Sequence, residues 1–418
     1  MPRISLAVRA MAAWAAAVAL LSSAACDLFG EVELGTYRAV LTLPGGEAPF
    51  GLEIKKEAGA PVAYLINGPE RVRVPDISIK GRRVEMTMPG FGNRLTATHT
   101  AKGLKGEVVL VKRDGVEQHI PLVAELGATY RFFKDPATDN ADVSGRWAAM
   151  FTEPNGKRAP GVGEFKQSFQ EVTGTFLRPA GDQRYLAGEM RGDDLYLSAF
   201  DGAHVYLLRA KVTRNGELAG KFWSGLAWVE DWMARRDPNA ALADANAVTT
   251  IRDDTWSFGF TFPDETGKPI SLADRKFRNK VVIVTLAGSW CPNCHDAAGF
   301  MAPFYDENRE RGLEVVALMF EHFGDFERAA HAVTEFRRKF GIQYTTLIAG
   351  VSDKDDAASK LPQLNGVFAF PTTLFVDRRG RVRRIHTGFS GPATGEHYEE
   401  LVKSFAETAQ MLLVEGSP

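Results

Sequence analysis

Short runs of alternating hydrophobic and polar residues dominate the chain from about residue 32 to about residue 245. The clearest runs are Tyr37–Leu43, Gly51–Lys55, Val62–Ile66, Arg83–Met88 and Gly106–Val111. Gly, Pro, Asn and Asp separate these runs, and such residues favour turns. Alternation with a period of two between turn residues predicts antiparallel β-strands that bury one face.

The β-rich region also contains an internal similarity. Three motifs recur at a nearly constant offset: Gly35-Thr36-Tyr37 and Gly145-Arg146-Trp147, Ile79-Lys80-Gly81 and Met190-Arg191-Gly192, and Leu104-Lys105-Gly106-Glu107 and Leu218-Ala219-Gly220-Lys221. This recurrence predicts a duplication, in which two β-meander halves form a barrel or a pair of sandwiches. Chance similarity between β-hairpins is the alternative. We expect the first repeat over residues 26–140 and the second over residues 141–245.

The pattern changes after about residue 250, where helical and strand patterns alternate. The continuous apolar run Val281–Leu286 is typical of a strand buried on both faces. The residues that follow predict a helix to about Arg311, a strand Leu313–Phe320, a helix Asp325–Phe340, a strand Tyr344–Ile348, a hairpin of Thr373–Val376 and Val382–His386, and a helix His397–Leu413. This alternation predicts an α/β layer with mixed strand directions over residues 250–418.

The motif Cys291-Pro292-Asn293-Cys294 directly follows the apolar run. Residues three apart lie on one face of a helix, so the two sulfurs can form and release a disulfide. Pro292 suits the first helical position, which makes Cys291 the cap residue, where the helix dipole favours a thiolate. We therefore predict Cys291 as an exposed nucleophile and Cys294 as the thiol that resolves the mixed disulfide.

The motif is also compatible with other kinds of site. A zinc site needs about four ligands, and the third cysteine, Cys26, lies far upstream. An inert structural disulfide is possible. Cys291-Pro-Asn-Cys294-His295 also satisfies the C-x-x-C-H pattern of c-type haem attachment, with Met301 or Met319 as a distal ligand. The preceding β-patterned strand favours dithiol redox chemistry over haem.

The region from about Asp254 to Leu413 resembles the thioredoxin superfamily, and especially the membrane-tethered thiol-disulfide oxidoreductases of the TlpA and ResA type. The motifs that carry this resemblance are Gly288-Ser-Trp-Cys-Pro-Asn-Cys294, Phe370-Pro371-Thr-Thr-Leu-Phe-Val-Asp377, and Gly380 in the turn that follows. The resemblance implies that Pro371 is a cis proline beside the disulfide and that the backbone of Phe370 pairs with an incoming peptide. Together with Trp290, which is expected to cover the cysteines, these residues are the predicted substrate-binding residues.

The chain departs from the family pattern at two positions. Thr285 stands where thioredoxins bury an aspartate, and Ala297 stands where ResA-like proteins often carry a glutamate. Asp296 is adjacent, but its place on the helix points to a different face. The proton acceptor for Cys294 is therefore not identified. The resemblance favours a reductant of envelope disulfides, although the direction of electron flow is not fixed by the motif.

The N-terminus predicts export. Arg3 and Arg9 precede the apolar run Ala10–Leu21, which is too short to span a bilayer and ends in small residues. We predict that residues 1–25 are a signal peptide and that Cys26 is acylated, which would anchor the chain to the membrane on the periplasmic side. A single acyl chain anchors weakly, so two or three would be needed. Ordinary cleavage after Ala25 is the alternative, since Ser23 replaces the usual leucine.

Composition sets further bounds. The 418 residues are enough for several domains, and a net charge of −2 gives no basic excess, so no nucleic-acid partner is expected. Three cysteines in an exported protein indicate folds held by packing. His99, His119 and His204 are scattered without metal-ligand spacing, so neither a metal nor another cofactor is expected. The expected partners are protein thiols or disulfides and a membrane electron donor.

Two classes of function remain open. The first is an enzyme that reduces disulfides through Cys291 and Cys294. The second is a binding protein that has lost turnover on a thioredoxin-like fold; copper delivery is disfavoured because its cysteines are spaced further apart. The β-rich region has no assigned chemistry and is expected to hold substrate or to space the redox domain from the membrane. Aromatic residues there could line a peptide groove, although most such residues are core: Phe50, Phe91, Trp223, Trp228 and Trp232.

Overall fold

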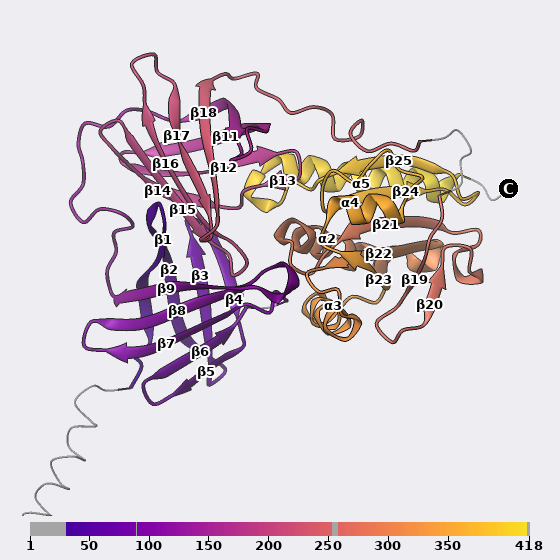
Figure 1. The fold of residues 1–418 in the computed structure, drawn as a ribbon, viewed down its shortest axis with the longest axis horizontal. Coiled ribbons are helices and arrows are strands. Elements are labelled where there is room, and N and C mark those ends of the chain that lie inside the picture. The colour runs from indigo at the N-terminus through magenta and orange to yellow at the C-terminus, as the bar shows by residue number, and fades with distance from the viewer. Residues whose placement is uncertain (1–30, 89, 253–257, 416–418) are drawn as a thin grey trace, which may run out of the picture.

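The computed structural model describes residues 31–88, 90–252 and 258–415. The predicted signal peptide and Cys26 lie outside the described residues. Two antiparallel β-sheets are followed by an α/β domain, which confirms the predicted fold class. Figure 1 shows the two sheets stacked on one side of the molecule and the α/β domain on the other. Among the described residues, no helix is both long and apolar enough to cross a membrane.

The described residues up to Leu126 form a nine-stranded sheet with the order β4-β3-β2-β1-β9-β8-β7-β6-β5. Its strands are β1 (Gly35–Leu43), β2 (Gly46–Glu57), β3 (Ala60–Asn67), β4 (Glu70–Val74), β5 (Ile77–Lys80), β6 (Arg83–Thr87), β7 (Arg94–Thr100), β8 (Gly103–Val111) and β9 (Glu117–Leu126). Alternate residues of β1, such as Tyr37, Ala39 and Leu41, are buried, as the period of two predicts. β4 and β5 are the two edges of this sheet.

The second sheet has the same design but closes on itself. Its strands are β10 (Gly145–Thr152), β11 (Arg158–Ser168), β12 (Glu171–Arg178), β13 (Gly181–Asp182), β14 (Leu186–Arg191), β15 (Asp194–Phe200), β16 (Val205–Val212), β17 (Leu218–Ser224) and β18 (Trp228–Arg236). Their order is β11-β10-β18-β17-β16-β15-β14-β12-β13, with a further pairing of β11 to β12. This extra pairing joins the two sides of the sheet and makes a barrel.

The repeated motifs occupy equivalent places in the two sheets. The hydroxyl of Tyr37 donates to the Glu33 carbonyl at 2.6 Å, and the indole N–H of Trp147 donates to the Val143 carbonyl at 2.9 Å. In both sheets, therefore, an aromatic residue at the start of the first strand binds the carbonyl four residues upstream. The duplication predicted from the sequence extends to these side-chain contacts.

Two glycine positions show the same equivalence. Gly106 on β8 and Gly220 on β17 each approach the neighbouring strand so closely that an added Cβ would lie 1.9 Å from a carbonyl oxygen, that of Thr96 or of Arg209. Both positions exclude a side chain. The two sheets also pack on each other: the Phe50 ring contacts the Phe200 ring edge-on at 4.9 Å between centroids. The β-rich region is therefore one packed unit.

The described residues from Phe258 form a β-hairpin and a five-stranded sheet of order β23-β22-β21-β24-β25, covered by helices. The strands are β19 (Thr261–Pro263), β20 (Pro269–Ser271), β21 (Val281–Ala287), β22 (Leu313–Glu321), β23 (Thr345–Val351), β24 (Thr372–Val376) and β25 (Val382–Thr387). The helices are α2 (Pro292–Asn308), α3 (Phe326–Phe340), α4 (Lys354–Lys360) and α5 (Glu396–Val414). β21 pairs parallel to β22 and antiparallel to β24, so strand directions are mixed as predicted.

Candidate active site

The Cys291–Cys294 motif lies where β21 ends and α2 begins. Cys291 is the N-cap of α2, with extended backbone, and Pro292 takes the first helical position. The Cys291 sulfur accepts the backbone N–H of Cys294 at 3.3 Å and lies 3.5 Å from the carbonyl oxygen of Phe370. Both cysteines are free thiols in the structure. An N–H aimed at the sulfur of the cap residue stabilises negative charge there.

Cys291 is less accessible than its predicted role suggested. Only 5% of its surface is exposed, and Cys294 is 1% exposed. The β-barrel of the second sheet lies over the motif: the side-chain amide of Asn293 donates to the carbonyl of Ala180 in the barrel at 3.4 Å, and to that of Phe389 in its own domain at 3.2 Å. The prediction of an exposed nucleophile is therefore wrong, and Cys291 lies on the floor of a cleft.

Cys294 lies deeper than Cys291, as predicted for the resolving thiol. Burial, followed by the hydrogen bond and negative charge of Cys291, raises the pKa of Cys294 well above its ordinary value. Cys294 therefore holds its proton at neutral pH, and loss of the charge on Cys291 removes one cause of the raised pKa while burial remains. That order suits a reaction in which Cys291 reacts first.

The other predicted substrate-binding residues lie around Cys291. The Phe370–Pro371 peptide bond is cis, as the family resemblance implied. The Trp290 indole N–H donates to the Phe320 carbonyl at 2.7 Å, and its ring contacts Phe370 edge-on at 5.9 Å. Trp290 also stacks on His322 at 4.9 Å between centroids. The structure thus brings Trp290, Phe370 and Pro371 together beside the reactive sulfur.

A buried carboxyl group that the sequence analysis missed lies beneath this loop. Glu321 ends β22 with 1% of its surface exposed, and it accepts the backbone N–H of Ser289 at 2.9 Å and the Ser289 hydroxyl at 2.6 Å. Burial raises the pKa of Glu321 to about 7, and its charge contributes to the raised pKa of Cys294. An ionisable residue directly after the apolar run Val315–Phe320 was the available signal.

His295 does not fit the haem alternative. One ring nitrogen, Nε2, lies 2.6 Å from the Ser289 carbonyl, and the other, Nδ1, lies 2.8 Å from the ammonium nitrogen of Lys339. Phe91 from the first sheet stacks on the ring at 4.0 Å between centroids. Burial and the charge of Lys339 lower the pKa of His295 well below its ordinary value. With both nitrogens engaged and the ring covered, His295 is not placed to bind a haem iron.

Asp296 points away from the cysteines, as predicted, and pairs with Arg184 of the barrel. Arg184 is 11% exposed and also pairs with Glu70 of the first sheet at 2.9 Å and with Asp201 of the barrel at 3.3 Å. Burial raises the pKa of Asp296 to about 7 despite its cationic partner. One arginine thus joins both sheets to the helix that carries the cysteines.

Between the barrel and the α/β domain runs a cleft of about 510 Å³. The barrel supplies Tyr206, Phe222 and Trp228 to its walls, and the α/β domain supplies Trp290, Cys291, Phe368 and Phe370. Of the aromatic residues proposed from sequence for a groove, Trp228 lies here, whereas Phe50 and Trp232 are core. The β-rich region therefore forms part of the site.

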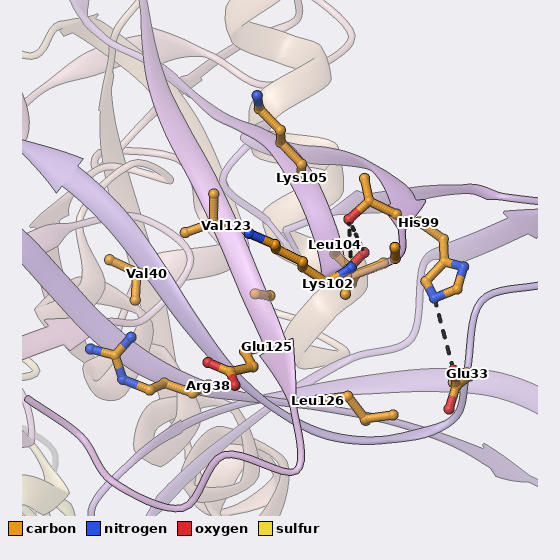
Figure 2. A pocket seen from close by; sticks show the side chains of 14 residues that line it. Glu33, Arg38, Val40, His99, Lys102, Leu104, Lys105, Val123, Glu125 and Leu126 are labelled. Carbon is orange, nitrogen blue, oxygen red and sulfur yellow. Dashed lines mark hydrogen bonds and ion pairs between the residues drawn. The ribbon is translucent and has the colours of Figure 1, made fainter. Parts of the chain in front are cut away.

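A second cavity, of about 1060 Å³, lies on the first sheet and shares no lining residue with the cleft. Figure 2 shows Arg38, Lys105, Val123 and Glu125 around it, with His99 and Glu33 joined at one end. The nitrogen of His99 and the oxygen of Glu33 are 4.0 Å apart. Among the described residues, no cysteine lines this cavity, whereas Cys291 lines the cleft.

Fold and site together define a thioredoxin-fold domain with a dithiol at the start of its first long helix. Residues 257–385 match the model of the AhpC/TSA family, so the C-terminal region is a thioredoxin-fold domain of this family. The match ends before helix α5 and does not include the β-rich region.

Named relatives align with the same region. The thiol-disulfide oxidoreductase ResA of Bacillus thuringiensis subsp. konkukian (strain 97-27) is 28% identical over 144 residues, which are 34% of this chain and 73% of the relative. ResA of Bacillus subtilis (strain 168) is 26% identical over 165 residues, 40% of this chain and 82% of the relative. The crystal structure of a thioredoxin-family thiol:disulfide interchange protein from Chlorobium tepidum TLS aligns with 39% of this chain and 99% of its own, at 20% identity and a TM-score of 0.30.

Proposed function

We propose that this chain is a cell-envelope thiol-disulfide oxidoreductase that reduces disulfides of exported proteins through Cys291 and Cys294. The observation that carries the proposal is the N-cap sulfur of Cys291, stabilised by the Cys294 N–H and set beside the Phe370 carbonyl, at the floor of a cleft. Homology of the domain to proteins named thiol-disulfide oxidoreductase supports the same chemistry.

The reaction has two displacement steps. The Cys291 thiolate attacks one sulfur of a substrate disulfide, a mixed disulfide forms, and the other substrate sulfur leaves as a thiolate that takes up a proton. Cys294 then loses its proton and attacks the Cys291 sulfur, which releases the second substrate thiolate and leaves a Cys291–Cys294 disulfide. Two electrons pass from the dithiol to the substrate. A membrane-bound thiol donor would restore the dithiol.

We assign Glu321 as the group that accepts the proton of Cys294. Once Cys291 is bound in the mixed disulfide, its negative charge no longer opposes ionisation of Cys294. A carboxyl with a pKa of about 7 can take that proton at neutral pH. Ser289 holds Glu321 through two hydrogen bonds and lies two residues before Cys291. This assignment fills the role left open by Thr285 and Ala297.

The cellular location follows from the N-terminus. The predicted signal peptide and an acylated Cys26 would place the domain outside the cytoplasm and hold it at the membrane. Mass spectrometry of the mature N-terminus tests this part separately: an unmodified Cys26 would remove the lipid anchor from the proposal and leave the redox chemistry untouched.

Reduction of insulin disulfides by the purified chain with a dithiol donor tests the chemistry. Cys291→Ser should reduce the rate by at least about a thousandfold, because no other nucleophile is available at the cap position. Cys294→Ser should accumulate a stable mixed disulfide with the substrate, visible as added mass that a reductant removes. Cys26→Ser is the matched control and should keep the wild-type rate. A wild-type chain inert toward disulfides would favour a binding protein without turnover.

A further inference from the structure

The cleft above Cys291 has walls from two domains, and each wall presents an exposed aromatic side chain. Trp228 of the barrel is 42% exposed, and Phe368 of the α/β domain is 46% exposed. Single exposed apolar residues are common on protein surfaces, but two that line one cavity beside a reactive sulfur form an apolar binding surface. Tyr206 and Phe222 extend this surface toward the floor of the cleft.

Besides Arg178, three lysine or arginine side chains line the same cleft from opposite walls. Lys157 and Arg158 come from the turn into β11 and the start of that strand, and Lys354 is the first residue of α4. Within the described part of the chain, none of the three has a carboxylate oxygen within ion-pair distance of its side chain; Glu153 is the acidic neighbour on this side of the cleft. Desolvation, followed by the charge of Lys157, lowers the pKa of Lys354, so the two cations oppose each other.

The remaining charges of the cleft are already engaged. Arg178 pairs with Glu230 at 3.1 Å. The Asp182 carboxylate accepts the N–H of Gly391 at 2.5 Å and that of Arg184 at 3.0 Å. The side chains left to meet a ligand are therefore mainly cationic and aromatic. An anionic group between Lys157 and Lys354 would relieve the repulsion between them.

The depth of Cys291 limits how a substrate can arrive. With 5% of Cys291 exposed, a disulfide on the flat surface of a folded protein cannot reach the sulfur. A cleft of about 510 Å³ can accept a short extended segment of polypeptide. The segment must place its cysteine at the floor while its neighbouring residues meet the walls.

We propose that the cleft selects unfolded or protruding polypeptide segments in which a disulfide-bonded cysteine has an aromatic or large apolar neighbour and an aspartate or glutamate a few residues away. The apolar neighbour lies between Trp228 and Phe368, and the acidic side chain binds Lys157, Arg158 and Lys354. The barrel of the second sheet is thus the specificity element of the enzyme. This inference rests on the proposed disulfide reductase function.

Reduction of two disulfide-linked peptides of equal length tests the inference. Both contain a Phe beside the cysteine, and one carries two Asp residues where the other carries two Lys. Wild type should reduce the acidic peptide with a kcat/KM about tenfold higher at low ionic strength, since Lys157, Arg158 and Lys354 attract its Asp residues and repel the Lys residues of the other peptide. The ratio should fall toward one at about 0.5 M salt, where surface charges are screened.

Substitutions in the protein test which residues cause the preference for the acidic peptide. The triple change Lys157→Glu, Arg158→Glu and Lys354→Glu should reverse the preference, whereas Lys211→Glu, on the exposed surface of β16 outside the cleft, should preserve it. Trp228→Ala should lower kcat/KM several-fold for the Phe-containing acidic peptide and leave a peptide with Ala at that place unchanged. Far-ultraviolet circular dichroism confirms that the variants are folded.

The outcomes separate the two proposals. If wild type reduces both peptides equally and the triple variant changes neither, the specificity inference is overturned and the reductase function stands. If neither peptide nor insulin is reduced, the reductase function itself has failed. If the disulfide of a small acidic thiol is reduced as efficiently as the acidic peptide, the occupant is not a polypeptide segment and the inference is again overturned.

Discussion

The two β-sheets are copies of one design that contact the α/β domain in different ways. The first sheet reaches it with loops: Phe91 stacks on His295, the N–H of Asp114 donates to the His322 carbonyl at 2.8 Å, and Arg113 pairs with Asp353 at 2.7 Å. The second sheet places a closed barrel over the cysteines and buries Arg184 between the domains. One copy supports the site from the side, and the other covers it.

The two sheets contact the α/β domain differently because of the strands at which the second sheet closes into a barrel. β11 pairs with β12, and the short β13 that follows extends to a bridge between Gly181 and Phe389 of the α/β domain. In Figure 1, β13 is the part of the barrel nearest to α5. The residues from Arg178 to Gln183 line the cleft, and Arg184, which follows them, is the buried arginine. The β12–β13 hairpin is therefore the part of the second sheet that forms a wall of the candidate site.

The largest expected difference between the two interfaces is in the free energy of unfolding that is lost when the arginine at each interface, Arg184 or Arg113, is replaced. Arg184→Ala should lower the free energy of unfolding by about 3–5 kcal/mol, because it leaves Glu70, Asp201 and Asp296 buried without their cation. Arg113→Ala removes a half-exposed ion pair and should cost less than about 1 kcal/mol. Urea unfolding of both variants measures this difference, and equal costs would mean that the two sheets are attached alike.

The pH dependence of the free energy of unfolding should also differ between the two interfaces. The pKa of Asp296 is raised to about 7 in the folded chain, so the folded state binds a proton that the unfolded chain, with an ordinary aspartate, has released. Stability contributed in this way is present at acidic pH and is lost as the pH rises through about 7. From pH 5 to pH 8 the loss due to Asp296 should be about 3 kcal/mol.

Asp296→Asn isolates this effect. The asparagine resembles the protonated carboxyl, so the variant should match wild type only below about pH 4, where the unfolded aspartate is also protonated, and should exceed it in stability by an amount that grows up to about pH 7. Glu321 titrates in the same direction and remains in both proteins, so the difference between the two unfolding curves belongs to Asp296. Asp353, at the interface of the first sheet, has a lowered pKa and should contribute no loss in this range. Parallel curves for wild type and variant would contradict the raised pKa.

Much of the fold could be predicted because its signals are local. Alternation along Tyr37–Leu43 marks β1, and the apolar run Val281–Leu286 marks β21. Helix α3 begins after Asp325, whose side chain accepts the N–H of Arg328, a cap that the sequence shows directly. The short helix α4 and the hairpin of β19 and β20 were not predicted, because elements of a few residues leave little periodic pattern.

In the candidate site, too, features with a local sequence signal could be predicted and features without one could not. The dithiol lies within a motif of four consecutive residues, so the sequence revealed it, and the family resemblance implied the cis conformation of Pro371. Arg184 has partners from three separate parts of the chain, and no pattern around it indicates burial. The cover over Cys291 likewise depends on how the barrel docks, which alternation within strands does not encode. Contacts of long sequence separation were therefore the part that sequence reasoning missed.

The smallest expected effect tests the equivalence of the sheets directly. Gly106→Ala and Gly220→Ala each place a Cβ 1.9 Å from a carbonyl oxygen of the neighbouring strand, so the strands must separate locally. Overpacking of this kind should cost about 2 kcal/mol at each site, with the two values within about 0.5 kcal/mol of each other. Gly259→Ala is the control, since its added Cβ meets no atom within 4 Å. Unfolding in urea measures all three, and a large cost at only one strand would show that the copies have diverged in their cores as well as in their interfaces.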